Sequence, residues 1–153
     1  KIDLSIIKSV IKSNKNRNKL LIYRINKIMS YNLKNKNIAF LGVTFKAGTD
    51  DMRESSSLSI IPSLVRKGAK VFYYDPSGPK QNFKNKRVKF CKNIKEACKK
   101  TDLIIIHTEW NEFKQLNFKK LVKKKNFKIF DMRNLYSPEK MKKNNLNYFG
   151  IGR

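Results

Sequence analysis

Apolar residues in the first 36 positions recur every three or four residues, and this segment contains neither glycine nor proline. Such spacing is typical of a helix with one apolar face. The segment is therefore predicted to form one long helix, or two, whose apolar face carries Leu4, Ile7, Ile11, Leu21, Ile25 and Ile28. Residues 12–19 contain no apolar side chain, so this stretch is expected to be surrounded by solvent or to face a partner outside the chain.

The pattern changes after residue 36 to short apolar runs that alternate with amphipathic segments. Runs of strand length occupy residues 38–43, 70–74, 88–91, 103–107 and 127–131. Because these runs are apolar almost throughout, both faces of the sheet should be covered, as in a parallel sheet packed between helices. Helices are predicted at residues 55–67, 94–100, 118–124 and 138–143. The fold class is therefore α/β, a parallel sheet flanked by helices and preceded by a long N-terminal helix.

The loop after the first predicted strand, residues 44–54, holds the strongest candidate chemistry. It contains one lysine, one arginine and two aspartates, and three serines follow at residues 55–57, where a helix begins. Backbone N–H groups and the helix dipole favour an anion at such a position. The loop is no dinucleotide fingerprint, because neither G-x-G-x-x-G nor G-x-x-x-x-G-K-[ST] occurs. The alternative is structural, with helix caps formed by the aspartates and serines and surface ion pairs among Lys46, Asp50, Asp51 and Arg53.

The chain is strongly basic, with 36 lysines and arginines against 11 aspartates and glutamates and a formal net charge of +25. A basic nucleic-acid-binding module is therefore one alternative. The lysines are spread over nearly every segment, however, and no helix-turn-helix, zinc-finger or RNP pattern accompanies them. A solvated basic surface without a specific nucleic-acid partner is the preferred interpretation. The 40% of hydrophobic residues excludes a disordered basic tail.

Cysteine and histidine are scarce, with two cysteines and one histidine in 153 residues. They cannot fill a zinc site on their own, so no metal is predicted, and a reducing, cytoplasmic compartment is expected. No apolar stretch is long enough to span a membrane, so no membrane partner is expected. Cys91 and Cys98 are interpreted as buried or inert thiols, and His107 as a hydrogen-bonded residue at the end of a strand.

Several separated motifs stand in one order along the chain: the first loop, Asp75-Pro76, TEWNEF at 108–113, DMRNLY at 131–136 and YFGIGR at 148–153. Together they resemble the C-terminal domain of the UDP-glucose 6-dehydrogenase family, from about Ser9 to the last residue. TEWNEF with YFGIGR is more similar to the UDP-glucose branch than to the GDP-mannose or UDP-N-acetylmannosamine branches. Dehydrogenases for those two nucleotide sugars remain alternatives.

The resemblance implies a Rossmann-like, UDP-sugar-binding domain over residues 37–153. Residues 1–36 would be the end of the long helix of a central domain and its linker, with Asn14 at the family's usual Asn. The resemblance assigns Phe45, Lys46 and Arg133 to the substrate UDP-glucose and Arg53 to the cofactor NAD. Met132 stands where the family often has glycine.

The same resemblance implies an enzyme that oxidises UDP-glucose to UDP-glucuronate with two NAD. Its nucleophilic cysteine belongs to a central domain, so no catalytic residue is assigned here and this chain alone is expected to be inactive. The N-terminal NAD-binding domain and the central domain are expected partners, with a homo-oligomer formed through the central domain. Because the first residue is lysine rather than methionine, a longer natural chain is expected. A third possibility is a structural interaction domain that has lost its ligand.

Overall fold

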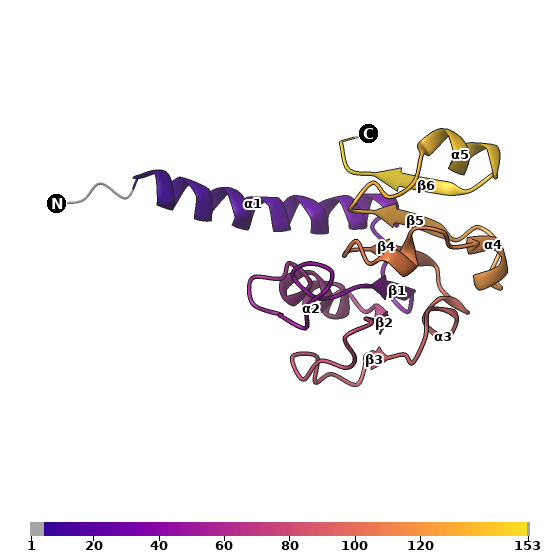
Figure 1. The fold of residues 1–153 in the computed structure, drawn as a ribbon, viewed down its shortest axis with the longest axis horizontal. Coiled ribbons are helices and arrows are strands. Elements are labelled where there is room, and N and C mark those ends of the chain that lie inside the picture. Colours follow the sequence, from indigo (N-terminus) through magenta and orange to yellow (C-terminus); the bar gives the residue numbers. More distant parts are fainter. Residues whose placement is uncertain (1–4, 153) are drawn as a thin grey trace.

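The computed structural model describes residues 5–152, although for residues 5–8, 11 and 15 only the backbone is described (Figure 1). In chain order the helices and strands are α1 (Ser5–Ile28), β1 (Asn37–Leu41), α2 (Ser57–Arg66), β2 (Lys70–Tyr74), β3 (Val88–Phe90), α3 (Ile94–Cys98), β4 (Leu103–Ile106), the 3-10 helix η1 (Asn111–Phe113), α4 (Phe118–Leu121), β5 (Lys128–Asp131), α5 (Pro138–Lys143) and β6 (Asn147–Gly150).

The described strands form one sheet in the order β3-β2-β1-β4-β5-β6, and every neighbouring pair is parallel. The chain builds one half of this sheet outward from β1, then returns to the centre at β4 and builds the other half. In open sheets of this kind the crevice beyond the carboxyl ends of the two central strands is where ligands bind. The predicted α/β fold with a parallel, Rossmann-like sheet is confirmed.

Side chains of the central strands alternate between two hydrophobic cores, one on each face of the sheet. Ile38 and Phe40 of β1 face the core shared with α1 and α2. Ala39 and Leu41 face the core shared with α3, α4 and α5. All four are fully buried, which explains why the central strands are apolar throughout rather than alternating.

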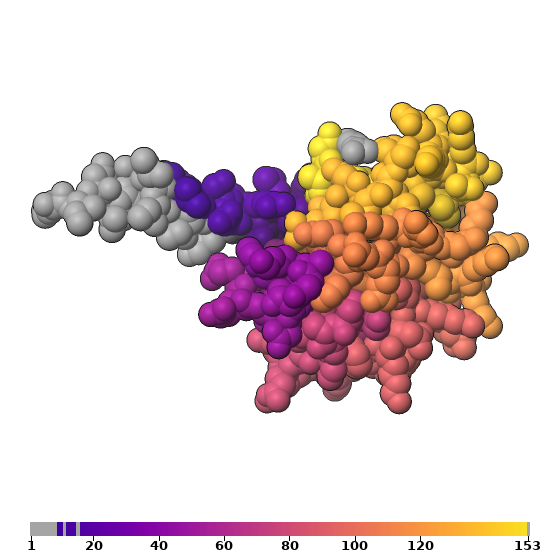
Figure 2. All heavy atoms as spheres, viewed as in Figure 1, coloured from indigo at the N-terminus to yellow at the C-terminus, as the bar shows by residue number. Residues whose placement is uncertain are grey.

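Helix α1 is a single helix, one of the two predicted possibilities, and only its second half belongs to the core. Leu21, Ile25 and Ile28 are buried, and the Arg24 guanidinium lies 5.5 Å from the centre of the Phe130 ring. The first half extends beyond the rest of the molecule (Figure 1, Figure 2). Among the described residues, no helix is both long and apolar enough to cross a bilayer.

Most predicted elements are present, and their ends differ for identifiable reasons. The first strand ends at Leu41 rather than residue 43, because Gly42 takes a positive φ of 77°. Helix α2 spans Ser57–Arg66 rather than 55–67, with Gly68 beyond its end at a φ of 88°. Strand β6 was not predicted, and the motif YFGIGR overlaps it. With only two aromatic residues among its four, an edge strand of this length carries no clear periodic signal.

Candidate functional site

A cavity of about 620 Å³ lies at the carboxyl edge of the sheet, beyond the ends of β1, β4 and β5. Four segments line it: the middle of α1, the loop between β1 and α2, and the turns that follow β4 and β5. The lining residues are Asn14, Arg17, Asn18, Leu21, Phe45, Lys46, Glu54, Ser56, His107, Glu109, Met132 and Arg133. The cavity therefore occupies the crevice that the reversal of strand order between β1 and β4 creates.

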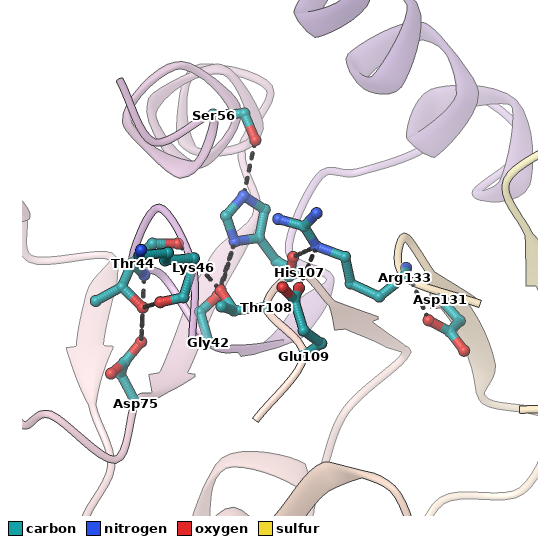
Figure 3. A network of polar contacts seen from close by, with 10 residues as sticks. All are labelled: Gly42, Thr44, Lys46, Ser56, Asp75, His107, Thr108, Glu109, Asp131 and Arg133. Carbon is teal, nitrogen blue, oxygen red and sulfur yellow. Dashed lines mark hydrogen bonds and ion pairs between the residues drawn. The ribbon is translucent and has the colours of Figure 1, made fainter. Parts of the chain in front are cut away.

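Asp75, directly after β2, holds the start of the first loop in place. Its buried carboxylate accepts hydrogen bonds from the backbone N–H groups of Val43 at 2.7 Å and Thr44 at 3.2 Å. The other carboxylate oxygen accepts the N–H of Ser77 at 3.0 Å. The Thr44 hydroxyl lies 3.0 Å from the Lys46 carbonyl and donates to it. This network, of which Figure 3 shows Asp75, Thr44 and Lys46, fixes the backbone that carries the cavity-lining residues Phe45 and Lys46.

Gly42 allows the ends of β1 and β4 to approach each other. A Cβ atom at this position would lie 2.5 Å from the Cβ of Thr108, closer than real side chains pack. The Thr108 hydroxyl in turn lies 3.1 Å from the Thr44 carbonyl and donates to it. Only glycine fits both this space and the positive φ of 77°, so Gly42 is required for the narrow base of the loop.

His107 lies beneath the cavity and is 3% exposed. Its Nδ1 atom is 3.1 Å from the Gly42 carbonyl, and its Nε2 atom is 2.7 Å from the Ser56 hydroxyl oxygen. Burial and the nearby Arg133 charge lower the imidazole pKa to about 3, so the ring is neutral at physiological pH. The interpretation of His107 as a hydrogen-bonded residue at a strand end is confirmed.

Arg133 is oriented from three sides. Its backbone N–H donates to the buried Asp131 carboxylate at 2.9 Å. Its Nε atom donates to the His107 carbonyl at 2.7 Å and lies 2.9 Å from the Glu109 carboxylate in an ion pair. No described residue hydrogen-bonds its two terminal nitrogens, which are left for a ligand.

Met132 takes no left-handed backbone conformation and is buried as part of the cavity wall, so the turn forms without the glycine that the family often has there.

Arg53 does not line the cavity, in contrast to Phe45, Lys46 and Arg133. Its guanidinium forms a two-pronged pair with the Asp51 carboxylate, at 2.9 Å for Nη2 and 3.1 Å for Nε, and its side chain is 90% exposed. Hydrogen bonds from Arg53 lower the pKa of the Asp51 carboxyl. The surface ion-pair interpretation is confirmed for Arg53. Lys46 forms no ion pair with any described residue, so that interpretation was wrong for Lys46.

The structural alternative, capping of α2 by serine side chains, holds for Ser55 but not for Ser56. The Ser55 hydroxyl accepts the N–H of Ser57, the first residue of α2, at 3.3 Å, whereas Ser56 is the N-cap residue and its hydroxyl makes no capping hydrogen bond. The Ser55 and Ser57 hydroxyls also donate to the carbonyl of Val43, at 2.7 and 2.6 Å. The serines therefore tie the start of the helix to the end of β1, and Ser56 is left free to reach His107.

The two cysteines take no part in the cavity. Cys91 and Cys98 are free and buried in the core on the α3 side of the sheet. Burial raises the pKa of the Cys91 thiol to about 11 and that of Cys98 to about 12. Thiols with such pKa values carry almost no thiolate at neutral pH, which confirms the prediction of buried, inert thiols. The described residues contain no group of three His, Cys, Asp or Glu that could hold a metal ion.

The cavity combines positive charge with several hydrogen-bonding groups. Arg17, Lys46 and Arg133 supply cations, against the carboxylates of Glu54 and Glu109. Such a lining suits a ligand with phosphate oxygens and further polar groups. The sequence did not predict that α1 supplies Arg17 and its neighbours, because the long-range packing of α1 beside the loop leaves no local signal. The sequence-predicted residues Phe45, Lys46 and Arg133 come together here from two distant segments.

Comparison with known proteins gives a consistent picture. The family model described as UDP-glucose/GDP-mannose dehydrogenase family, UDP binding domain, matches residues 39–138. The chain is 43% identical over 156 residues to UDP-glucose 6-dehydrogenase of Rickettsia prowazekii, covering 99% of this chain and 36% of the relative. It is 33% identical over 152 residues to the enzyme of the same name from Rhizobium meliloti, covering 97% and 34%. The chain thus spans about a third of the length of the curated relatives it matches.

Solved structures with the same fold include two sugar-nucleotide dehydrogenases. A UDP-glucose dehydrogenase from Pyrobaculum islandicum superposes with a TM-score of 0.71 at 21% identity, covering 85% of this chain and 29% of that one. A GDP-mannose dehydrogenase from Pseudomonas aeruginosa superposes with a TM-score of 0.71 at 19% identity, covering 98% and 34%. At these identities the likeness shows the fold.

Proposed function

This chain belongs to the UDP-glucose/GDP-mannose dehydrogenase family, of which it carries the UDP-binding domain, and we propose that it binds the UDP-sugar substrate of a UDP-glucose 6-dehydrogenase in the cavity at the carboxyl edge of its sheet. The complete enzyme would oxidise UDP-glucose to UDP-glucuronate with NAD. This chain alone would bind the nucleotide sugar without turning it over, because neither of its cysteines reaches the cavity.

The observation that carries the proposal is the convergence of Phe45, Lys46 and Arg133 on one cavity. Lys46 supplies an exposed ammonium group, and Arg133 offers two terminal guanidinium nitrogens fixed by the hydrogen bond from Nε to the His107 carbonyl. A diphosphate is well matched by one point charge and one planar fork. Phe45, which is 51% exposed, offers an aromatic surface for the ribose or the base.

UDP-glucose is preferred over the other nucleotide sugars because the relatives that match over nearly the whole chain, at 43% and 42% identity, are both named UDP-glucose 6-dehydrogenase. GDP-mannose or UDP-N-acetylmannosamine is the alternative, since dehydrogenases for these sugars share the fold.

The remaining roles belong to the same proposal. Arg53, outside the cavity and 90% exposed on its side chain, would contact NAD held by an N-terminal domain. Residues 1–36 would end the helix and linker of a central domain through which the enzyme forms a homo-oligomer, and residues 37–153 would form the UDP-sugar-binding domain. A cytoplasmic enzyme is supported by the free thiols of Cys91 and Cys98.

The proposal is tested by titrating this chain with UDP, UDP-glucose and GDP-mannose while amide NMR shifts are followed. We expect UDP and UDP-glucose to compete and to shift residues of the cavity, with GDP-mannose weaker than either. A duplex DNA of random sequence is the polyanion control, and its binding should fade between about 50 and 200 mM salt. Failure of UDP to bind at 150 mM salt, or shifts confined to the lysine-rich outer surface, would contradict the proposal.

A further inference from the structure

The hydrogen bonds around His107 determine which ring nitrogen carries the proton. Nδ1 lies 3.1 Å from the Gly42 carbonyl, which can only accept. It also lies 3.1 Å from the Thr108 hydroxyl oxygen, and the Thr108 proton is already donated to the Thr44 carbonyl at 3.1 Å. Both neighbours of Nδ1 are therefore acceptors, so Nδ1 carries the hydrogen.

The neutral ring then presents a lone pair at Nε2, and the Ser56 hydroxyl must donate to it across 2.7 Å (Figure 3). A doubly protonated ring is disfavoured because His107 is buried and the charged groups Arg133 and Arg17 act against a positive ring, while Asp75 acts weakly in its favour. The hydroxyl proton of Ser56 is thus used in the hydrogen bond to His107 and cannot be donated to a ligand.

Ser56 nevertheless lines the cavity. With its only hydrogen directed at His107, the hydroxyl oxygen can offer the cavity nothing but lone pairs. No described residue donates a hydrogen bond to this oxygen. The cavity therefore contains one neutral site that accepts a hydrogen bond but cannot give one, next to cationic side chains that only donate.

We propose that Ser56 is a specificity-determining residue that accepts a hydrogen bond from the sugar or nucleoside part of the bound ligand, either a hydroxyl group or the N–H of the base. The proposal rests on the proposed function of the cavity and deepens it. A diphosphate presents only acceptor oxygens at neutral pH, so it is repelled by the Ser56 oxygen and attracted by Lys46 and Arg133. The ligand is thereby oriented with its phosphates toward the cations and a donor group toward Ser56.

The test is a set of binding cycles with this chain, in which Ser56→Ala is combined with UDP-glucose and with three altered ligands, each lacking one donor-bearing part of it. The ligands are UDP-glucose, UDP without the hexose, the 2′-deoxyribose form of UDP-glucose, and UDP-glucose methylated at N3 of uracil. Ser59→Ala is the matched control, because Ser59 lies on the same helix, donates to the Ser56 carbonyl at 2.9 Å and does not line the cavity.

We expect Ser56→Ala to weaken UDP-glucose about three- to tenfold, the range for one neutral hydrogen bond, and Ser59→Ala to stay within twofold of the parent. One of the three altered ligands should bind the parent more weakly than UDP-glucose does by a similar factor, yet bind Ser56→Ala as tightly as UDP-glucose does. The group that this ligand lacks is then the donor to Ser56. Equal losses for every altered ligand in both proteins would overturn the role of Ser56.

A second measurement checks the proton arrangement without any ligand. Nitrogen NMR of His107 should show a protonated Nδ1 and an unprotonated Nε2, and Ser56→Ala should change the Nε2 shift more than the Nδ1 shift. The opposite tautomer would overturn the proposal even if UDP binds. If the parent chain binds none of the nucleotides, the proposed function and this inference both fail, whereas normal binding by Ser56→Ala defeats the inference alone.

Discussion

Glu109 and Arg133, which follow β4 and β5 and both line the cavity, form an ion pair with 2.9 Å between the Glu109 Oε2 and Arg133 Nε atoms. The same Nε donates to the His107 carbonyl at 2.7 Å. Both contacts use Nε, so the two terminal nitrogens form no hydrogen bond with any described residue. An arginine can be anchored and bind at the same time, because its donors lie at fixed positions around one plane.

This geometry predicts that lysine cannot replace Arg133. We expect Arg133→Ala to weaken UDP about ten- to a hundredfold, as for loss of a charge-assisted hydrogen bond. Arg133→Lys should recover no more than about threefold, since one ammonium group cannot contact both the anchor and the diphosphate. Isothermal titration with UDP measures both variants. Near-parental binding by Arg133→Lys would show that charge alone is recognised.

Lys46 and Arg53 lie on one loop, yet they should differ in UDP binding. Lys46 lines the cavity and pairs with no described carboxylate, whereas Arg53 lies outside it and pairs with Asp51. We expect Lys46→Ala to weaken UDP about tenfold and Arg53→Ala to leave it within twofold. Lys84→Ala, a change at an exposed lysine outside the cavity, controls for net charge. Equal losses of UDP affinity for all three variants would show that only the net charge of the chain matters.

Asp75 should matter for stability as well as for binding. One oxygen of its carboxylate accepts the N–H groups of Val43 and Thr44, and the other accepts the N–H of Ser77. An asparagine there would replace one of these acceptor oxygens by an NH2 group, which faces N–H donors and cannot accept from them. We expect Asp75→Asn to lower the free energy of unfolding by about 1–3 kcal/mol and to weaken UDP, since the loop carrying Lys46 loses its anchor. Urea unfolding measures the first effect. An unchanged midpoint would show that the loop is held by other contacts.

The elements of the fold were predictable where burial on both faces left continuous apolar runs. Residues 103–106 of β4 are all fully buried, and the sequence shows four consecutive apolar residues there. Strand β6 was not predictable, because at the sheet edge only Gly150 of its four residues is buried. The start of α2 at Ser57 involves a hydroxyl contact with the Val43 carbonyl, 14 residues earlier, which the local pattern does not reveal.

The candidate site was predictable only in part. Lys46 and Arg133 were identified by resemblance, and the structure brings them to one cavity. The partnership of Ser56 with His107 was not predicted, since it joins positions 51 residues apart that each have an ordinary local role. Its signal is a polar aromatic residue at the end of an otherwise apolar strand, which is informative only once the strand order places it beside the loop after β1.

His107 also makes the stability of the chain depend on pH. Its pKa is lowered from 6.5 to about 3 in the folded state, chiefly because the ring is buried. The unfolded chain therefore binds one more proton than the folded chain between these two values. The contribution of His107 to stability is fully present above about pH 6.5 and is lost as the pH falls toward 3.

Between pH 7 and pH 5, this single group should lower the free energy of unfolding by about 2 kcal/mol. The interval lies above the range in which ordinary carboxylates titrate, so their contribution is small there. His107→Gln is the matched variant, because an amide can replace the donor and acceptor of the neutral ring but does not titrate. Urea unfolding at pH 5, 6 and 7 should show a falling midpoint for the parent and a flat one for His107→Gln. If the midpoints of the parent and of His107→Gln fall equally, the pH dependence comes from other groups. The pKa of His107 is then not lowered by its burial.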